Sequence, residues 1–263
     1  MTSEKREYTR KGICIWCLKT KPNVTFYTKP HTIPKKLESN IIGFDICDSC
    51  NRYFGSDNNS EKVTFSVDKV FKEFFNVHKF LLTNNKDSNS WRKFKSQFFN
   101  YYHSNKTLKL NLDYRRNQYY ARELTRKFKR GIYNVFLQEY HRCTKNGLDS
   151  QFDRLRQFVR FDKNDIPIYY LQSSNGVRLH DDLNMSPRLP FNDYSKSIIS
   201  EYGFYHLSLT GLNFFLAVTD KADSNYDYIE KTSLEYIGSG FAYKGLVELK
   251  RLDQVDFTLR NWR

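Results

Sequence analysis

Two pairs of cysteines near the N-terminus constrain this chain more than any other feature. Cys14 and Cys17 form one Cys-x2-Cys pair, and Cys47 and Cys50 form a second. Together they supply four thiolates, the number that a tetrahedral structural zinc needs. Because four protein ligands leave no open coordination position, we expect Zn²⁺ to be structural rather than catalytic and to close the loop between the two pairs.

Length and composition indicate a globular protein. The chain has 263 residues, 39% of them hydrophobic, which suffices for one large globular domain or two modest ones. It contains no apolar run of roughly 18 residues, the length of a membrane span, and its charged N-terminus lacks the apolar core of a signal peptide. We therefore expect a cytoplasmic protein with no membrane contact, in which paired cysteines bind metal rather than form disulfides. The fifth cysteine, Cys143, is expected to be a small buried helix residue.

The charge of the chain predicts a polyanionic partner. The formal net charge is +14, and residues 91–163 alone contain 18 Lys and Arg against 6 Asp and Glu. We expect DNA to be the partner, and RNA stays open because nothing in the sequence separates the two. Oligomeric state and protein partners are not indicated.

Hydrophobic periodicity predicts an α+β fold in three regions: residues 1–62, a basic helical region over residues 63–163, and an antiparallel β-rich region over residues 164–263. In the first region, residues 41–46 alternate like a strand, and a helical turn is expected near Asp48. Further helices are predicted over residues 68–82 (with Asp68 as its cap), 91–102, 118–145 and 148–161, and further strands over residues 166–171, 203–210, 212–218 and 241–249.

The predicted helix over residues 118–145 combines a hydrophobic stripe with basic residues. Aromatic and aliphatic residues recur every fourth position and predict a buried face. Most of the basic residues lie off this stripe, so we expect them to face solvent or a phosphate backbone. They are Arg122, Arg126, Lys127, Lys129 and Arg130.

Residues between and after the cysteine pairs agree with a known pattern. His31 opens the run His-Thr-Ile-Pro, and the last cysteine is followed by Asn51 and, after two more residues, by Phe54 and Gly55. Read with the four cysteines, they resemble the HNH endonucleases, and more narrowly the branch whose ββα-metal core is stapled by a zinc-binding cysteine tetrad. The similar portion spans about residues 12–55, roughly a sixth of the chain.

This resemblance implies a metal-dependent endonuclease that hydrolyses phosphodiester bonds in DNA to a 5′-phosphate and a 3′-hydroxyl. It implies that His31 is the general base, that Asn51 binds the catalytic Mg²⁺ or Mn²⁺, and that Asn40 braces the loop. A neutral imidazole with a pKa near 6.5 can take a proton from water, and Mg²⁺ accepts an amide oxygen. Many members carry an acidic metal ligand directly before the histidine, where this chain has Pro30.

Three basic residues flank this motif, and we expect Lys35, Lys36 and Arg52 to contact neighbouring phosphates. Phage defence, restriction of foreign DNA and housekeeping of mobile elements all fit such an enzyme. The alternative is a non-catalytic zinc ribbon that binds nucleic acid or acts as an adaptor. In that case His31 is an ordinary loop residue and Asn51 a helix-start residue; the lack of an acid before His31 supports this alternative.

Overall fold

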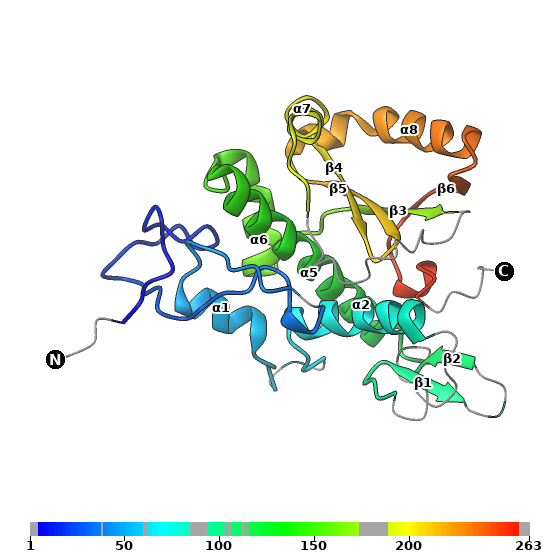
Figure 1. The fold of residues 1–263 in the computed structure, drawn as a ribbon, viewed down its shortest axis with the longest axis horizontal. Helices are drawn as coiled ribbons and strands as arrows, with labels where there is room; N and C mark the ends of the chain where they lie inside the picture. The colour runs from blue at the N-terminus through cyan, green and yellow to red at the C-terminus, as the bar shows by residue number, and fades with distance from the viewer. Residues whose placement is uncertain are drawn as a thin grey trace.

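A long central helix, α5 (Gln118–Thr144), organises the structure, a computed structural model (Figure 1). The described residues are 5–257, without 38, 60, 62, 85–93, 103, 105–106, 112–113, 115 and 174–188. The side chain of Asn117 caps the start of α5 by accepting a hydrogen bond from the backbone of Tyr120 at 3.1 Å. At the other end Lys145 adopts a left-handed conformation with φ 65° and ends the helix.

The N-terminal half of the described chain packs against one side of α5. Gly131 allows a close approach of α2, because a Cβ at this position would lie 2.7 Å from Cβ of Phe71. A two-stranded antiparallel sheet, β1-β2, follows α2. The elements of this half are α1 (Asp48–Gly55), α2 (Val67–Asn84), β1 (Phe99–Tyr102) and β2 (Thr107–Leu110), and α6 (Asp153–Phe161) follows α5.

A four-stranded antiparallel sheet forms the C-terminal part, with strand order β4-β5-β3-β6. β4 and β5 form a hairpin whose last pair is Leu209 with Leu212. Two helices, α7 and α8, cover the sheet face that points away from α5 (Figure 1). The elements are β3 (Ile168–Ser173), α7 (Asp193–Tyr202), β4 (Phe204–Leu209), β5 (Leu212–Ala217), α8 (Tyr226–Gly238) and β6 (Ala242–Glu248).

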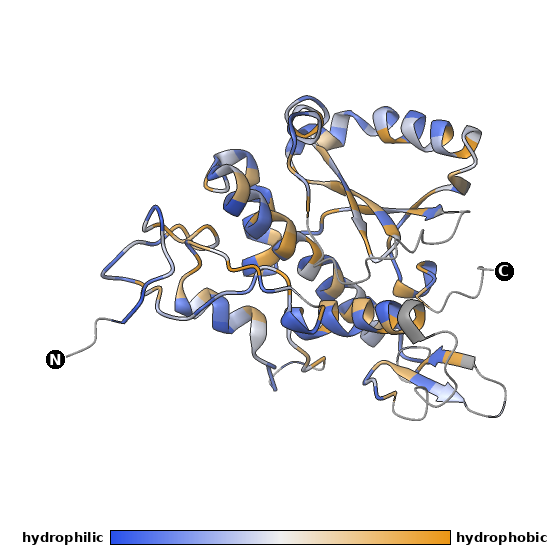
Figure 2. Ribbon diagram, in the orientation of Figure 1, coloured by the Kyte–Doolittle hydropathy of each residue, from blue (hydrophilic) through white to orange (hydrophobic). Residues whose placement is uncertain are grey.

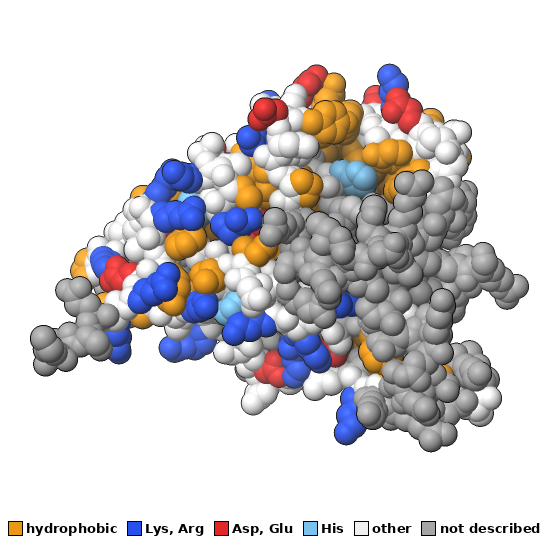
Figure 3. Space-filling model, viewed as in Figure 1, with side chains coloured by type: hydrophobic (Ala, Val, Ile, Leu, Met, Phe, Trp, Pro, Cys, Tyr) orange, Lys and Arg blue, Asp and Glu red, His pale blue; other side chains and the backbone are white. Residues whose placement is uncertain are grey.

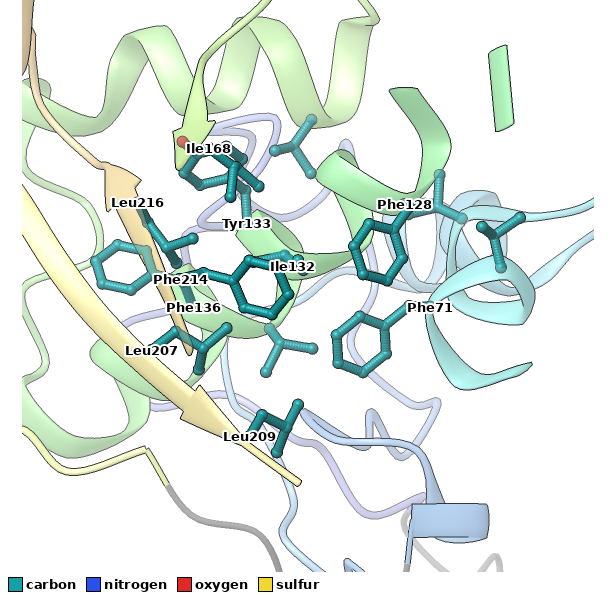
Figure 4. Close-up of a cluster of buried hydrophobic side chains, with 14 of the residues drawn as sticks. Phe71, Phe128, Ile132, Tyr133, Phe136, Ile168, Leu207, Leu209, Phe214 and Leu216 are labelled. Atoms are coloured by element: carbon teal, nitrogen blue, oxygen red, sulfur yellow. The ribbon is translucent and has the colours of Figure 1, made fainter. Parts of the chain in front are cut away.

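One hydrophobic core joins the three predicted regions. Phe128, Ile132 and Phe136 of α5 pack in one cluster with Phe71 of α2 and Phe214 of the sheet (Figure 4). The strands carry long hydrophobic stretches, whereas α1 is mostly hydrophilic or neutral (Figure 2). The core therefore fixes α2, α5 and the sheet relative to one another, and α1 lies at its margin.

The predicted α+β fold is confirmed, with a cysteine cluster at its N-terminal end and an antiparallel sheet at its C-terminal end. Most predicted helices and strands form within a few residues of their expected bounds, but α7 and α8 were not predicted. The helix predicted over residues 91–102 is wrong where the structure describes it, because residues 99–102 form β1. Phe98 and Phe99 contact Phe74 of α2 at ring distances of 5.2 and 5.3 Å, so tertiary packing favours the strand. In residues 41–46 the expected strand is reduced to a single bridge between His31 and Ile42.

Basic residues in the middle of α5 are not at the surface. Lys129 and Arg130 were expected to face solvent or phosphate, but their side chains are only 4% and 2% exposed. Their cationic groups pair with Asp165 at 2.7 Å and Asp162 at 3.0 Å. The prediction fails because residues 127–141 of α5 are enclosed on all sides, so that basic residues off the hydrophobic stripe are buried there as well and need ionic partners.

A buried carboxylate fastens the N-terminal segment to α5. Oδ1 of Asp45 accepts hydrogen bonds from the backbone amides of Arg10, Lys11 and Gly12 at 2.9 to 3.0 Å. Its Oδ2 lies 3.0 Å from Nε2 of His141 in α5. Burial alone would raise the pKa of Asp45, but the hydrogen bonds, that of His141 first, hold it well below its usual range.

We expect Asp45→Asn to lower the free energy of unfolding by about 3 kcal/mol, because asparagine has one accepting oxygen where Asp45 uses two, so either the backbone amides or His141 lose their acceptor. The melting temperature should fall by roughly 6–12 °C in a thermal denaturation experiment. Asp193→Asn is the matched control, since the side chain of Asp193 is fully exposed and the change should stay within about 0.5 kcal/mol. Equal melting temperatures for both variants would contradict the anchoring by Asp45.

Candidate functional site

The four predicted cysteines come together in one cluster. The sulfur atoms of Cys14, Cys17, Cys47 and Cys50 all lie within 4.8 Å of one another, and those of Cys17 and Cys47 are 3.7 Å apart. A tetrahedral zinc with Zn–S bonds of about 2.3 Å would separate its sulfur ligands by about 3.8 Å. The cluster therefore has the ligand number and spacing to hold a metal such as zinc.

Local backbone geometry and one arginine shape this cluster. Leu18, in a left-handed conformation with φ 57°, turns back so that its amide donates to the carbonyl of Cys14 at 2.8 Å. Cys47 is the N-cap of α1 and Cys50 lies in the first turn of that helix. From α6, Nε of Arg160 lies 3.2 Å from the sulfur of Cys50, where its positive charge favours a thiolate. Arg160 carries no sequence signal for this position, because it lies 110 residues after Cys50 in the chain.

A pocket of about 660 Å³ lies between α1, the start of α2 and the segment around His31. Both residues with expected catalytic functions, His31 and Asn51, line it. Its other charged side chains are those of Lys29, Asp57, Asp68, Lys69 and Lys72. The pocket thus combines an imidazole, an amide, three ammonium groups and two carboxylates in a volume that can hold a phosphate group.

Two short antiparallel segments and α1 position His31 and Asn51. His31 is bridged to Ile42, and the amide of Gly43 donates to the carbonyl of Pro30 at 2.9 Å. The carboxylate of Asp48 in α1 accepts from the backbone amide of Thr28 at 2.7 Å, which ties the chain leading to His31 to the helix that carries Asn51. The order of elements around the pocket is therefore strand-like segment, strand-like segment, helix.

The electrostatics of the pocket favour a neutral imidazole at His31. Partial burial lowers the pKa of His31, and the positive charges of Lys35 and Lys29 lower it further. Because the ordinary value is about 6.5, His31 is uncharged at neutral pH and can accept a proton.

The other predicted site residues of the N-terminal region do not line this pocket. Asn40 is exposed and is not among the residues that line the pocket. Lys35 and Lys36 are exposed on a 3-10 turn, where Lys36 lies 3.2 Å from Glu73. Arg52 is exposed on α1 and lines an adjoining pocket of about 370 Å³.

Of the basic residues expected on α5 to contact nucleic acid, Arg122 remains at the surface with 72% of its side chain exposed. Arg126 is only 21% exposed and pairs with Asp162 at 2.6 Å. Lys129 and Arg130 are buried, as described above. In the view of Figure 3, Lys and Arg side chains outnumber acidic ones over the N-terminal segment, so the positive surface there comes largely from residues outside α5.

Two acids in the pocket were not predicted as site residues. Asp68 was expected to cap its helix, but the hydroxyl of Ser66 takes that place by accepting from the amide of Lys69 at 3.3 Å. The carboxylate of Asp68 instead accepts a hydrogen bond from Asn134 at 3.1 Å, and burial raises its pKa to about 6. Asp57 pairs with Lys69 at 2.8 Å, and this pairing lowers its pKa.

A comparison of the chain with models of protein families, with curated proteins and with solved structures finds no match. Within the described part of the chain, helices long and apolar enough to cross a membrane are absent. A functional assignment therefore depends on the residues of the site itself.

We expect Cys47→Ser to lose bound zinc and to lower the melting temperature, because a structural metal stabilises the fold that binds it. Zinc content by atomic emission and thermal denaturation measure the two effects. Cys143→Ser is the matched control, since Cys143, contrary to expectation, is exposed on α5 rather than buried. A Cys47→Ser protein with wild-type zinc content and melting temperature would contradict a zinc function for the cluster.

Proposed function

We propose that this protein is a metal-dependent endonuclease of the HNH type that hydrolyses phosphodiester bonds in DNA. The observation that carries the proposal is that His31 and Asn51 line one pocket next to the cysteine cluster. The sequence pattern assigns both residues to catalysis, and a shared pocket is the arrangement that joint action on one phosphate requires. Defence against phage or other foreign DNA is a suitable biological setting.

Each group in the pocket has a chemical task in this proposal. The neutral imidazole of His31 takes a proton from the attacking water. The amide oxygen of Asn51 would hold Mg²⁺ or Mn²⁺, and such an ion would supply positive charge to neutralise a phosphate and a leaving oxygen. The ammonium groups of Lys29, Lys69 and Lys72 attract the polyanion to the pocket.

The cysteine cluster holds this site in shape. Asn51 directly follows Cys50, so a metal bound by the four thiolates restrains the helix turn that carries the amide. The same metal closes the chain from Cys17 to Cys47, and His31 lies within that loop. Zinc in this position is structural, because its four thiolate ligands leave no place for a water or a phosphate.

Exposed cations outside the pocket provide contacts to the DNA backbone in this proposal. Lys35, Arg52 and Arg122 are exposed and remain candidates, whereas Lys129 and Arg130 are excluded because their side chains are buried and paired with acids. Backbone contacts of this kind make binding strongly salt-dependent and insensitive to sequence.

The test is cleavage of supercoiled plasmid by zinc-loaded protein with and without Mg²⁺. We expect His31→Ala to reduce the single-turnover rate about 10²- to 10⁴-fold, the usual contribution of a general base. Asn51→Ala should lose Mg²⁺-dependent cleavage, while Asn100→Ala, which changes an exposed asparagine of β1, should cleave like the wild type. Equal nicking by wild type and His31→Ala would rule out His31 as the base.

The absence of an acid before His31 favours one competing function, a non-catalytic zinc module that binds nucleic acid or an adaptor partner. In that case the wild type binds DNA in a salt-sensitive manner but does not cut it with Mg²⁺ or Mn²⁺. A parallel assay with single-stranded and duplex RNA decides whether RNA rather than DNA is the substrate.

A further inference from the structure

Asp68 lies in the pocket as an anion with little to neutralise it. Its Oδ1 accepts one hydrogen bond, from Nδ2 of Asn134 at 3.1 Å. No ion pair is found for Asp68 among the described residues; the charge of Lys72 acts on it only from a distance. A partly buried carboxylate with a single neutral hydrogen-bond donor is stabilised when it binds a proton or a cation.

The second carboxylate of the pocket, that of Asp57, has an ion-pair partner. Asp57 pairs with Nζ of Lys69 at 2.8 Å and accepts from the backbone amide of Ser66 at 2.9 Å. Its side chain is 39% exposed, so water and Lys69 compensate its charge. Of the two acids, only Asp68 lacks a compensating charge within ion-pair distance.

Asp68 also lies on the same side of α1 as Asn51. The free oxygen of its carboxylate, Oδ2, is 3.9 Å from the position that a Cβ would occupy at Gly55. Gly55 is four residues after Asn51 in α1, and residues four apart share a helix face about 6 Å apart along the axis. Asn51, Gly55 and Asp68 all line the pocket, so the carboxylate of Asp68 lies near the part of α1 that carries Asn51.

We propose that Asp68 is a second protein ligand of the catalytic divalent cation, delivered from α2 in place of the acid that this chain lacks at Pro30. The inference rests on the proposed function, because it concerns the metal that Asn51 would bind. A carboxylate together with an amide oxygen and several waters is a ligand set that Mg²⁺ and Mn²⁺ accept. The hydrogen bond from Asn134 of α5 would orient the carboxylate for binding.

If Asp68 served only to stabilise the helix, its substitution would have a different effect. Asp68 lies in the first turn of α2, where a negative charge stabilises the helix slightly by interacting with the helix dipole. If that were its only function, Asp68→Asn would lower the melting temperature slightly and leave metal binding unchanged.

The test is binding of Mn²⁺ to zinc-loaded protein without DNA, followed by the loss of the free Mn²⁺ signal in electron paramagnetic resonance. We expect one Mn²⁺ per chain for the wild type. Asp68→Asn should raise the dissociation constant at least about tenfold, a loss seen even when groups that only orient metal ligands are removed. Asp57→Asn is the matched control and should change the constant less than about threefold, because Asp57 is already paired with Lys69.

The outcomes separate this inference from the proposed function. Wild-type Mn²⁺ affinity in Asp68→Asn, together with Mg²⁺-dependent cleavage by the wild type, would overturn the inference alone. No Mn²⁺ binding and no cleavage by the wild type would overturn both. A melting temperature for Asp68→Asn close to that of the wild type guards against misfolding, and Asp68→Glu, which keeps a carboxylate, should recover part of the Mn²⁺ affinity.

Discussion

Buried ionic groups determine how the N-terminal segment is held against the helices. In the described part of residues 5–47, regular structure is limited to isolated bridges and one 3-10 turn, so side chains must satisfy many backbone groups. Asp45 accepts from three backbone amides, and Arg156 of α6 donates to the carbonyls of Ile15, Gly147 and Asp149. Both side chains are almost completely buried, which makes these hydrogen bonds strong and their loss costly.

Helix α5 also carries polar side chains that contact the residues of the pocket and the segment next to it. Asn134 of α5 bonds to Asp68 in the pocket, and one turn further Gln138 bonds back to Asn134 at 2.7 Å. Glu139 then bonds to the hydroxyl of Thr32, the residue after His31. A row of buried polar groups on α5 thus connects α2 with the strand-like segment that carries His31, and it explains why α5 is polar where its position would favour hydrophobic residues.

Burial also changes what the net charge means. Three basic residues of α5 have buried side chains whose cationic groups pair with more exposed acids: Lys127 with Glu61, Lys129 with Asp165 and Arg130 with Asp162. These cations stabilise the packing of α5 and are not available to a phosphate backbone. The positive surface is therefore smaller than the composition implies, and in the view of Figure 3 it lies largely over the N-terminal segment.

The sequence by itself determined the four cysteines of the cluster, the hydrophobic stripe of α5 and the alternating strands of the C-terminal sheet, because spacing and periodicity are local properties. It also singled out His31 and Asn51, which the fold places in one pocket. Only the tertiary structure decided that residues 99–102 form a strand, that Lys129 and Arg130 are buried, and that Asp68 joins the pocket. Each of these outcomes depends on which distant element of the chain packs against the residue, and this cannot be predicted from a local sequence pattern.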